Sequence, residues 1–196
     1  MHVYECDREC IDIVEKIFNS SFSWFHSYYA KSCIEVGVCR SVVAYEDEDV
    51  AIGVFYSIDK LSVGVIYYVA VLPTHRRRGV GKIIVASIEE ILSSEGISTF
   101  LATTRSSNIA SRRMLNGLGY MALELDRIDE DIREAITMLT CGYEDDILYI
   151  KTFDKPIDEF FKKLIQNLDT IELVWRTICY NPWRKLRKKT SLDNTN

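Results

Sequence analysis

Residues 69–82 read VAVLPTHRRRGVGK, and this stretch decides the fold that the rest of the chain can adopt. A β-branched apolar run ends at Val71, three arginines follow, and Gly79 and Gly81 stand where a helical pattern begins. A glycine-rich turn between a strand and a helix exposes consecutive backbone N–H groups, and the start of the helix adds partial positive charge. The stretch therefore predicts a phosphate-binding turn.

Three familiar motifs fit this turn only in part. A P-loop needs an earlier glycine and a serine or threonine after its lysine, but Ile83 follows Lys82. A dinucleotide fingerprint needs a third glycine where the chain has Ile84. A nucleic-acid patch accounts for the arginines but not for the glycines at a strand–helix junction. A solvated basic turn that only caps a helix is the simplest alternative.

The hydrophobic pattern around the turn predicts an α/β (α+β) chain with a mixed sheet. Alternating or continuous apolar runs predict strands at 2–6, 38–46, 50–58, 62–71, 98–103, 120–126 and 145–153. Apolar residues at helical spacing predict two helices within 8–33 and further helices at 79–96, 106–119 and 127–139. The last of these reads as an exposed acidic helix inserted before the final strand.

Composition limits the class of protein. The chain has 196 residues, 47% of them hydrophobic, and a formal net charge of −5, so bulk electrostatics argue against nucleic-acid binding. Six cysteines are scattered without metal-ligand spacing, which favours buried reduced thiols and no metal site. No apolar leader and no run of about 18 apolar residues is present, so we expect a cytoplasmic protein without an integral membrane segment.

The stretch resembles the pyrophosphate loop of the GNAT superfamily of acetyl-CoA-dependent N-acetyltransferases. The match consists of R-x-x-G-x-G from Arg76 through Gly79 to Gly81, with A-V-x-P just upstream at residues 70–73. Asn108 and the pair Gly119–Tyr120 resemble the segment that follows the family's fifth strand. The resemblance covers residues 1–153 and implies a mostly antiparallel sheet of about seven strands flanked by helices.

The resemblance also implies a donor site for acetyl-CoA, without a metal. Backbone groups at Val69 and Val71 would meet the pantetheine arm at a splayed strand end, and Asn108 would lie near the thiol. Backbone amides would wrap the pyrophosphate, while one or more of the arginines face the phosphates of CoA. The residues of this loop are Arg76, Arg77, Arg78, Gly79, Val80, Gly81 and Lys82.

The implied reaction is attack of a neutral amine on the acetyl thioester, with a backbone N–H near Val71 facing the oxyanion. Many family members have a tyrosine acid seven residues after the asparagine, and this chain has Leu115 there. Tyr120 is the predicted replacement acid, with Tyr143 and Tyr149 as alternatives. Glu124 and Tyr68 are the candidate bases, with Tyr67 beside the latter. His26 is interpreted first as a packed histidine and second as a catalytic one.

The resemblance implies that the acceptor is an amine, and we expect either a peptide or protein N-terminus or a small cationic amine. Tyr143, Glu144 and Asp145 are similar to the acidic ending of protein N-terminal acetyltransferases, and such charges favour a cationic substrate. The alternative function is a non-catalytic acyl-CoA-binding regulatory module that binds a partner through its C-terminal helix. Leu115 favours this alternative, because the family's acid is missing.

We expect residues 154–196 to form a C-terminal helix and a basic tail. Steps of four and three residues predict a helix with a narrow apolar seam. The seam consists of Ile157, Phe161, Leu164, Leu168, Ile171, Trp175 and Ile178. Packing onto its own domain is the simplest interpretation, and a homodimer through residues 157–178 is the next. Trp175, Trp183 and the basic run 184–189 also suit a membrane-surface helix.

Overall fold

A computed structural model describes residues 1–193, with side chains through Lys188. Its centre is a seven-stranded sheet in the order β1-β2-β3-β4-β5-β7-β6, in which every neighbouring pair is antiparallel except β4 and β5. The strands are β1 (His2–Cys6), β2 (Arg40–Glu46), β3 (Glu48–Ile58), β4 (Val63–Val71), β5 (Thr99–Thr104), β6 (Met121–Glu124) and β7 (Ile147–Thr152). The predicted mixed, mostly antiparallel sheet is confirmed.

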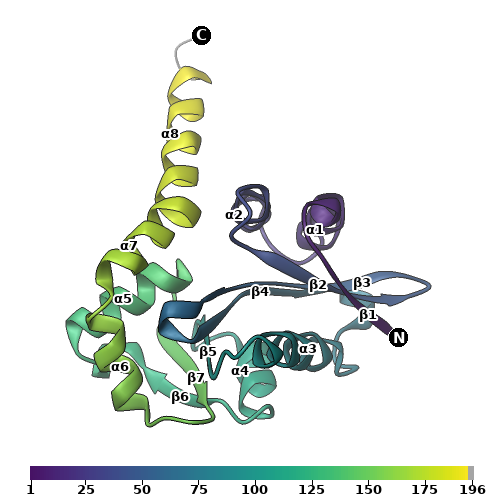
Figure 1. The fold of residues 1–196 in the computed structure, drawn as a ribbon. Coiled ribbons are helices and arrows are strands. Elements are labelled where there is room, and N and C mark those ends of the chain that lie inside the picture. Colours follow the sequence, from purple (N-terminus) through teal and green to yellow (C-terminus); the bar gives the residue numbers. More distant parts are fainter. Residues whose placement is uncertain (194–196) are drawn as a thin grey trace.

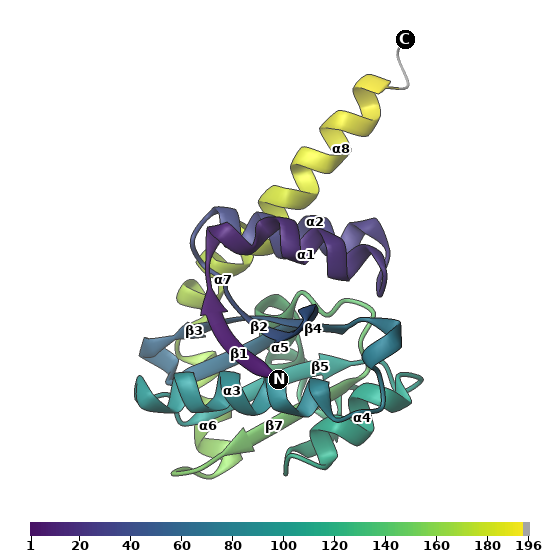
Figure 2. The ribbon, with the colours of Figure 1, turned by 90° about the vertical axis from the view of Figure 1, so that its right-hand side faces the viewer.

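Helices cover both faces of the sheet, as Figures 1 and 2 show. One face carries α1 (Ile11–Asn19) and α2 (Trp24–Glu35), and the other carries α3 (Val80–Ser94) and α4 (Ile109–Asn116). The remaining helices are α5 (Glu130–Thr140), α6 (Ile157–Ile165), α7 (Leu168–Trp175) and α8 (Asn181–Asp193). Two apolar clusters, one on each face, hold these layers together.

The contact between β4 and β5 is short. Pairing begins at Val63 with Thr99 and ends at Val65 with Leu101, although both strands continue beyond these residues. On its other edge β4 stays paired with β3, but Tyr67 is an extra residue between two paired positions, a β-bulge. The facing edges of β4 and β5 therefore part toward their C-terminal ends, as expected for the splayed strand end.

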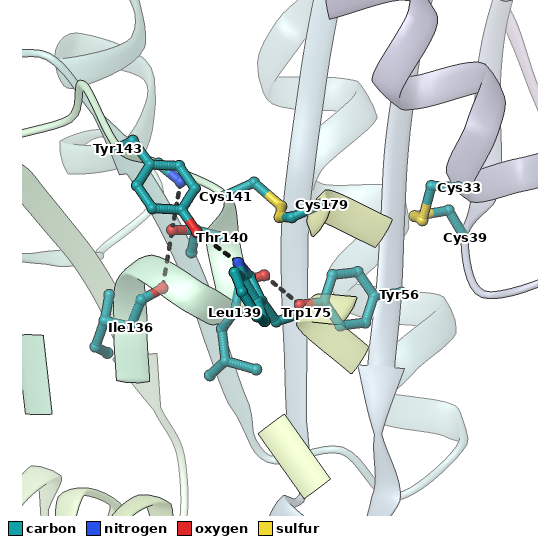
Figure 3. Close-up of a disulfide and its surroundings, with 11 residues drawn as sticks. Cys33, Cys39, Tyr56, Ile136, Leu139, Thr140, Cys141, Tyr143, Trp175 and Cys179 are labelled. Atoms are coloured by element: carbon teal, nitrogen blue, oxygen red, sulfur yellow. Dashed lines mark hydrogen bonds between the residues drawn. A yellow bond between two sulfur atoms is a disulfide. The ribbon is translucent and has the colours of Figure 1, made fainter. Parts of the chain in front are cut away.

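Helix α5 is less exposed than its acidic sequence predicts. Ala135, Ile136 and Leu139 are fully buried, so only its opposite side carries the acidic residues to solvent. The buried hydroxyl of Tyr56 on β3 donates a hydrogen bond to the carbonyl oxygen of Leu139 (Figure 3). An amphipathic helix of this kind packs by its apolar side, and here it forms part of the layer beneath the C-terminal segment.

The C-terminal segment is not one straight helix. The chain turns between α6 and α7, and a π-helical stretch at Arg176–Tyr180 joins α7 to α8. Three residues of the predicted seam, Leu164, Ile171 and Ile178, are completely buried within the chain, so the seam packs onto its own domain. Helix α8 then projects away from the body (Figure 1). Pairing of two copies stays a prediction, and it would need the exposed positions Leu168 and Leu173.

The prediction of reduced, unpaired cysteines is wrong for this structure. Three disulfides join Cys6 to Cys10, Cys33 to Cys39 and Cys141 to Cys179. The third pair could not be predicted from the sequence, because its two cysteines lie 38 positions apart. They come together only when α7 packs beside α5 in the folded chain. Disulfides persist mainly in oxidising compartments or in intracellular proteins of hyperthermophiles, so a cytoplasmic location stays a prediction.

Within residues 1–193, no helix is both long enough and apolar enough to cross a membrane.

The disulfides allow a test of the fold. Closing a loop restricts the unfolded chain more when the loop is long. We expect Cys141→Ser/Cys179→Ser to lower the free energy of unfolding by about 4 kcal/mol, and Cys6→Ser/Cys10→Ser by about 2 kcal/mol. Denaturant midpoints under oxidising conditions measure both. Equal losses from the two pairs, or six free thiols in the unreduced protein, contradict this assignment.

Candidate active site

A cavity of about 770 Å³ opens where β4 and β5 part, which is a size typical of small-molecule sites. Its walls come from α2, the ends of β4 and β5, the start of α4, the turn before β7 and the C-terminal segment. Val69 and Asn108, both predicted to meet the cofactor, line it together with Tyr68, a predicted base. The cavity therefore joins one end of the predicted donor site to a part lined mainly by aromatic side chains, which we call the chamber.

The phosphate turn ends at the start of α3. Gly79 is the residue before this helix, and its carbonyl accepts hydrogen bonds from the backbone N–H groups of Lys82 (2.9 Å) and Ile83 (3.2 Å). Among the described residues, none accepts a hydrogen bond from the backbone N–H groups of residues 77–81. Free donors at a helix N-terminus can bind an anion, so the backbone of this turn suits the phosphate contact that the sequence predicts, and that contact stays a prediction.

The two glycines of the turn have different roles. Gly79 has a φ of 82°, which side chains rarely adopt, and a Cβ there would meet no atom within 4 Å. Gly81 instead lies against α4, where a Cβ would come within 2.9 Å of the sulfur of Met114. Gly79 therefore sets the backbone direction over an open surface, while Gly81 allows α3 and α4 to approach each other.

The three arginines contribute less than their number suggests. Arg76 donates from its Nε to the carbonyl oxygen of Val71 at 3.1 Å, which ties the turn to the end of β4. Arg78 forms an ion pair with Glu46 at 2.9 Å, and Arg77 has a left-handed backbone with φ of 61°. Two of the three guanidinium groups thus have partners within the protein, and their predicted contacts with phosphates remain untested.

Asn108 is positioned by the turn between β5 and α4. Its side-chain oxygen accepts a hydrogen bond from the backbone N–H of Ser111 at 3.2 Å and so caps α4. The carboxylate of Asp146 binds both the backbone N–H and the hydroxyl of Ser106 in the same turn. These bonds to Ser106 lower the pKa of Asp146, which keeps it charged as the anchor of the turn.

Asp145 is one of two carboxylates that line the chamber, and the other, Glu144, forms an ion pair with Arg105. The Oδ2 of Asp145 accepts a hydrogen bond from the hydroxyl of Thr103 on β5 at 2.6 Å. Burial raises its pKa, against the opposing effects of Thr103 and the Arg105 guanidinium. Gly142 leaves room for this pair, because a Cβ there would come within 2.5 Å of the Thr103 hydroxyl. The sequence placed Asp145 in an acidic turn, but only the structure shows that it is half-buried.

His26 on α2 also lines the cavity. It packs against Phe22, Phe25 and Tyr68, with ring centroids 5.3–5.7 Å apart. Its Nδ1 is buried, and among the described residues it has no hydrogen-bond partner. Burial, then the charge of Arg105, lower the pKa of His26, so the imidazole is neutral at neutral pH. The ring contacts fit the packed interpretation, and the catalytic interpretation stays a prediction.

Five tyrosines line the same chamber: Tyr29, Tyr67, Tyr68, Tyr143 and Tyr180. Burial raises the pKa of Tyr29 to about 12 and raises those of Tyr68 and Tyr143 as well. A phenol with a raised pKa stays protonated at neutral pH and donates hydrogen bonds. Tyr68 therefore suits a proton donor better than the base that the sequence predicted.

Two of the predicted catalytic residues do not line the cavity. Tyr120 is buried on the other face of the sheet, in the cluster packed against α3. Glu124 lies exposed on β6 and pairs with Arg127 at 2.6 Å. Leu115 does line the cavity, at the position where the family often has its acid, and is 2% exposed. Catalytic roles for Tyr120 and Glu124 stay predictions without support from this geometry.

The chain belongs to the acetyltransferase (GNAT) family, because the family model matches residues 9–120, more than half of its length. That range includes the strands that part and the whole phosphate turn. No curated protein matches the sequence.

Solved structures share the fold at low sequence identity. The ribosomal-protein-S18-alanine N-acetyltransferase from Escherichia coli is 15% identical, with a TM-score of 0.56 over 79% of this chain and 95% of its own. A GNAT acetyltransferase from Staphylococcus aureus is 11% identical, with a TM-score of 0.61 over 77% and 98%. The PaiA N-acetyltransferase from Thermoplasma acidophilum, in complex with coenzyme A, is 12% identical, with a TM-score of 0.55 over 78% and 100%.

The predicted role of the phosphate turn can be tested by comparing two glycines that have similar positive φ angles. Gly79 and Gly96 have φ values of 82° and 87°, and a Cβ at either meets no protein atom within 4 Å. Replacing either glycine by alanine should therefore lower the free energy of unfolding by about 1–2 kcal/mol. We expect Gly79→Ala to weaken acetyl-CoA binding at least tenfold in calorimetry, because its Cβ enters the ligand's space. Gly96→Ala should bind as wild type, and equal affinities for both variants contradict the placement.

Proposed function

We propose that this protein transfers the acetyl group of acetyl-CoA to a primary amine held in the aromatic chamber. The observation that carries the proposal is the continuity of the cavity. It runs from Val69 and Asn108, beside the phosphate turn, to Asp145 beneath the aromatic walls. A thioester entering between β4 and β5 would thus meet an amine entering from the other side.

The donor would lie along the parted strands. The free N–H groups of residues 77–81 fit the pyrophosphate of CoA, and the unpaired edge of β4 beyond Val65 fits the pantetheine arm. The acetyl thioester would then reach the chamber near Asn108. Arg77 is free of the ion pair that Arg78 makes, so we assign it to the outer phosphates of CoA.

The acceptor amine arrives as an ammonium ion and must lose a proton before it attacks. Asp145 attracts the cation, and its raised pKa brings its proton affinity closer to that of the amine. The amine nitrogen then bonds to the carbonyl carbon, an oxyanion forms, and the carbon–sulfur bond breaks as the oxyanion collapses. The nitrogen loses its second proton to solvent, Asp145 releases the first one to solvent, and the amide product and CoA leave.

The departing thiolate accepts a proton from solvent or from a tyrosine. Leu115 cannot supply it, but the protonated hydroxyls of Tyr29, Tyr68 and Tyr143 face the same chamber. A thiol of pKa about 8.5 is also a tolerable leaving group without an acid. The missing tyrosine at position 115 is therefore compatible with turnover.

One experiment both identifies the class of acceptor and separates the transferase from the second candidate function. Calorimetry measures acetyl-CoA binding, and thiol release measures turnover with peptide N-termini and small cationic amines. Binding with turnover supports the transferase. Tight binding without turnover on any acceptor supports the non-catalytic acyl-CoA-binding module that Leu115 favours, and no binding at all contradicts both.

A pair of carboxylate variants tests the assignment of the base. Asp145→Asn should lower kcat/KM about a hundredfold for an acceptor amine of pKa near 10. The loss should be smaller for an amine of pKa near 8, because that amine loses its proton without help from a base. Activity requires the ionised carboxylate, so in wild type it rises as the pH passes upward through the raised pKa of Asp145. The activity of Asp145→Asn should not show this fall at low pH.

Glu124→Gln is the matched control, since Glu124 is exposed and lies outside the cavity. Its kcat/KM and pH profile should equal those of wild type. The opposite result, an active Asp145→Asn and an inactive Glu124→Gln, contradicts the assignment and favours the base that the sequence predicted.

A further inference from the structure

The C-terminal segment forms one wall of the chamber. Trp175, Tyr180 and Trp183 line the same cavity as Asn108 and Asp145. The three rings form a ladder: Trp175 stacks on Tyr180 with centroids 5.3 Å apart, and Tyr180 stacks on Trp183 at 5.8 Å. We call these three residues the aromatic wall. It lies outside the part of the chain that the family model matches.

The aromatic wall is fastened to the rest of the domain at three points. The disulfide between Cys141 and Cys179 joins it to the end of α5, and the indole N–H of Trp175 donates to the hydroxyl of Tyr143 at 2.5 Å (Figure 3). From α2, the hydroxyl of Tyr28 donates to the carbonyl oxygen of Pro182 at 3.1 Å. These attachments fix the position of the wall in the cavity that Phe25 and Tyr29 of α2 also line.

The charges of the chamber almost cancel. Among the described residues that line it, the only acidic and basic side chains besides tyrosine are His26, Arg105, Glu144 and Asp145. Arg105 and Glu144 form an ion pair with each other, and the lowered pKa of His26 keeps it neutral. Asp145 is hydrogen-bonded by the neutral hydroxyl of Thr103 and, within the described part of the chain, forms no ion pair. The chamber thus carries one carboxylate without a matching cation.

We propose that the acceptor is an amine with one positive charge on a flat apolar body, bound between the aromatic wall and α2. This proposal rests on the proposed function and names its substrate class. The ammonium would pair with Asp145, while the flat body would pack against the rings of the wall. Their faces already stack on one another and on Arg184 and Arg187, so we expect edge-to-face contact, which aromatic groups also favour. Free arylalkylamines and peptides that begin with a large aromatic residue share this chemistry.

The same wall disfavours more polar acceptors. A polyamine would bring further ammonium groups that find no second free carboxylate, and each would lose its hydration on burial. An acceptor rich in hydroxyl groups would exchange water for aromatic faces that accept few hydrogen bonds. A peptide that begins with a small residue would leave the wall in contact with water.

The proposal is tested with four acceptors and the full-length protein: tryptamine, a peptide beginning with tryptophan, a peptide beginning with alanine, and spermidine. We expect at least one of the first two to have a kcat/KM at least tenfold above both of the others. The better of the two identifies a free amine or a chain terminus as the source. Preference for spermidine or for the alanine peptide overturns the proposal.

Variants of the wall locate the effect. Trp175→Ala should raise KM for the preferred acceptor about tenfold with little change in kcat, and Trp183→Ala should do the same without removing the bond to Tyr143. Leu173→Ala, on the same segment but 67% exposed, is the control and should match wild type. Wall variants that retain wild-type KM contradict the proposal.

Failure of this proposal and failure of the proposed function give different results. Binding of tryptamine is measured by calorimetry without any turnover, with wild type and Trp175→Ala compared. Wall-dependent binding without acetylation upholds the acceptor site and contradicts the transferase activity. Acetylation of other amines, without wall-dependent tryptamine binding, upholds the activity and contradicts the acceptor class.

Discussion

The parting of β4 from β5 is the constraint on which the rest of the structure depends. A parallel pair that stays hydrogen-bonded along its whole length leaves no opening in a sheet. Here the pairing stops at Val65 and Leu101, and the extra residue at Tyr67 bends β4 away while β3 still holds its other edge. The cavity occupies the space this creates, so the proposed donor and acceptor sites both depend on one irregularity in the sheet.

The phosphate turn is a second consequence of the same strand. Because β4 ends at Val71 and α3 begins at Val80, the turn between them directly follows the parted strand, and the N–H groups of residues 77–81 within it bond to no described residue. The side chains of Arg76 and Arg78 bind Val71 and Glu46, and these contacts shape the turn. Under the proposed function, the backbone of the turn would therefore hold the pyrophosphate, and the run of arginines would mainly support the turn.

Local patterns in the sequence predicted the parts of the protein that depend on local structure. The strands, the helices on both faces and the glycine turn are readable because each depends on periodicity or on a short motif. Tyr120 shows where local patterns stop being sufficient. It follows a glycine with φ of 84°, and the chain direction after that turn places the ring on the α3 face rather than in the cavity.

Features that join distant segments were not predictable from spacing. The sequence showed that the C-terminal segment has an apolar seam, but not that its turn at 166–167 would direct Trp175 and Tyr180 into the chamber. Cys141 and Cys179 likewise give no sign of pairing until α7 lies beside α5. The acidic turn was visible, yet the half-burial that distinguishes Asp145 from its neighbours comes from Thr103 and the surrounding walls.

Hydrogen exchange of the backbone amides, with and without acetyl-CoA, tests the central claim most directly. The N–H groups of residues 77–81 bond to no described residue and should exchange quickly in the free protein. Acetyl-CoA should slow exchange at these residues and along the unpaired end of β4. Saturating acetyl-CoA that binds but leaves the exchange of residues 77–81 unchanged would contradict a backbone pyrophosphate site in the opening between β4 and β5.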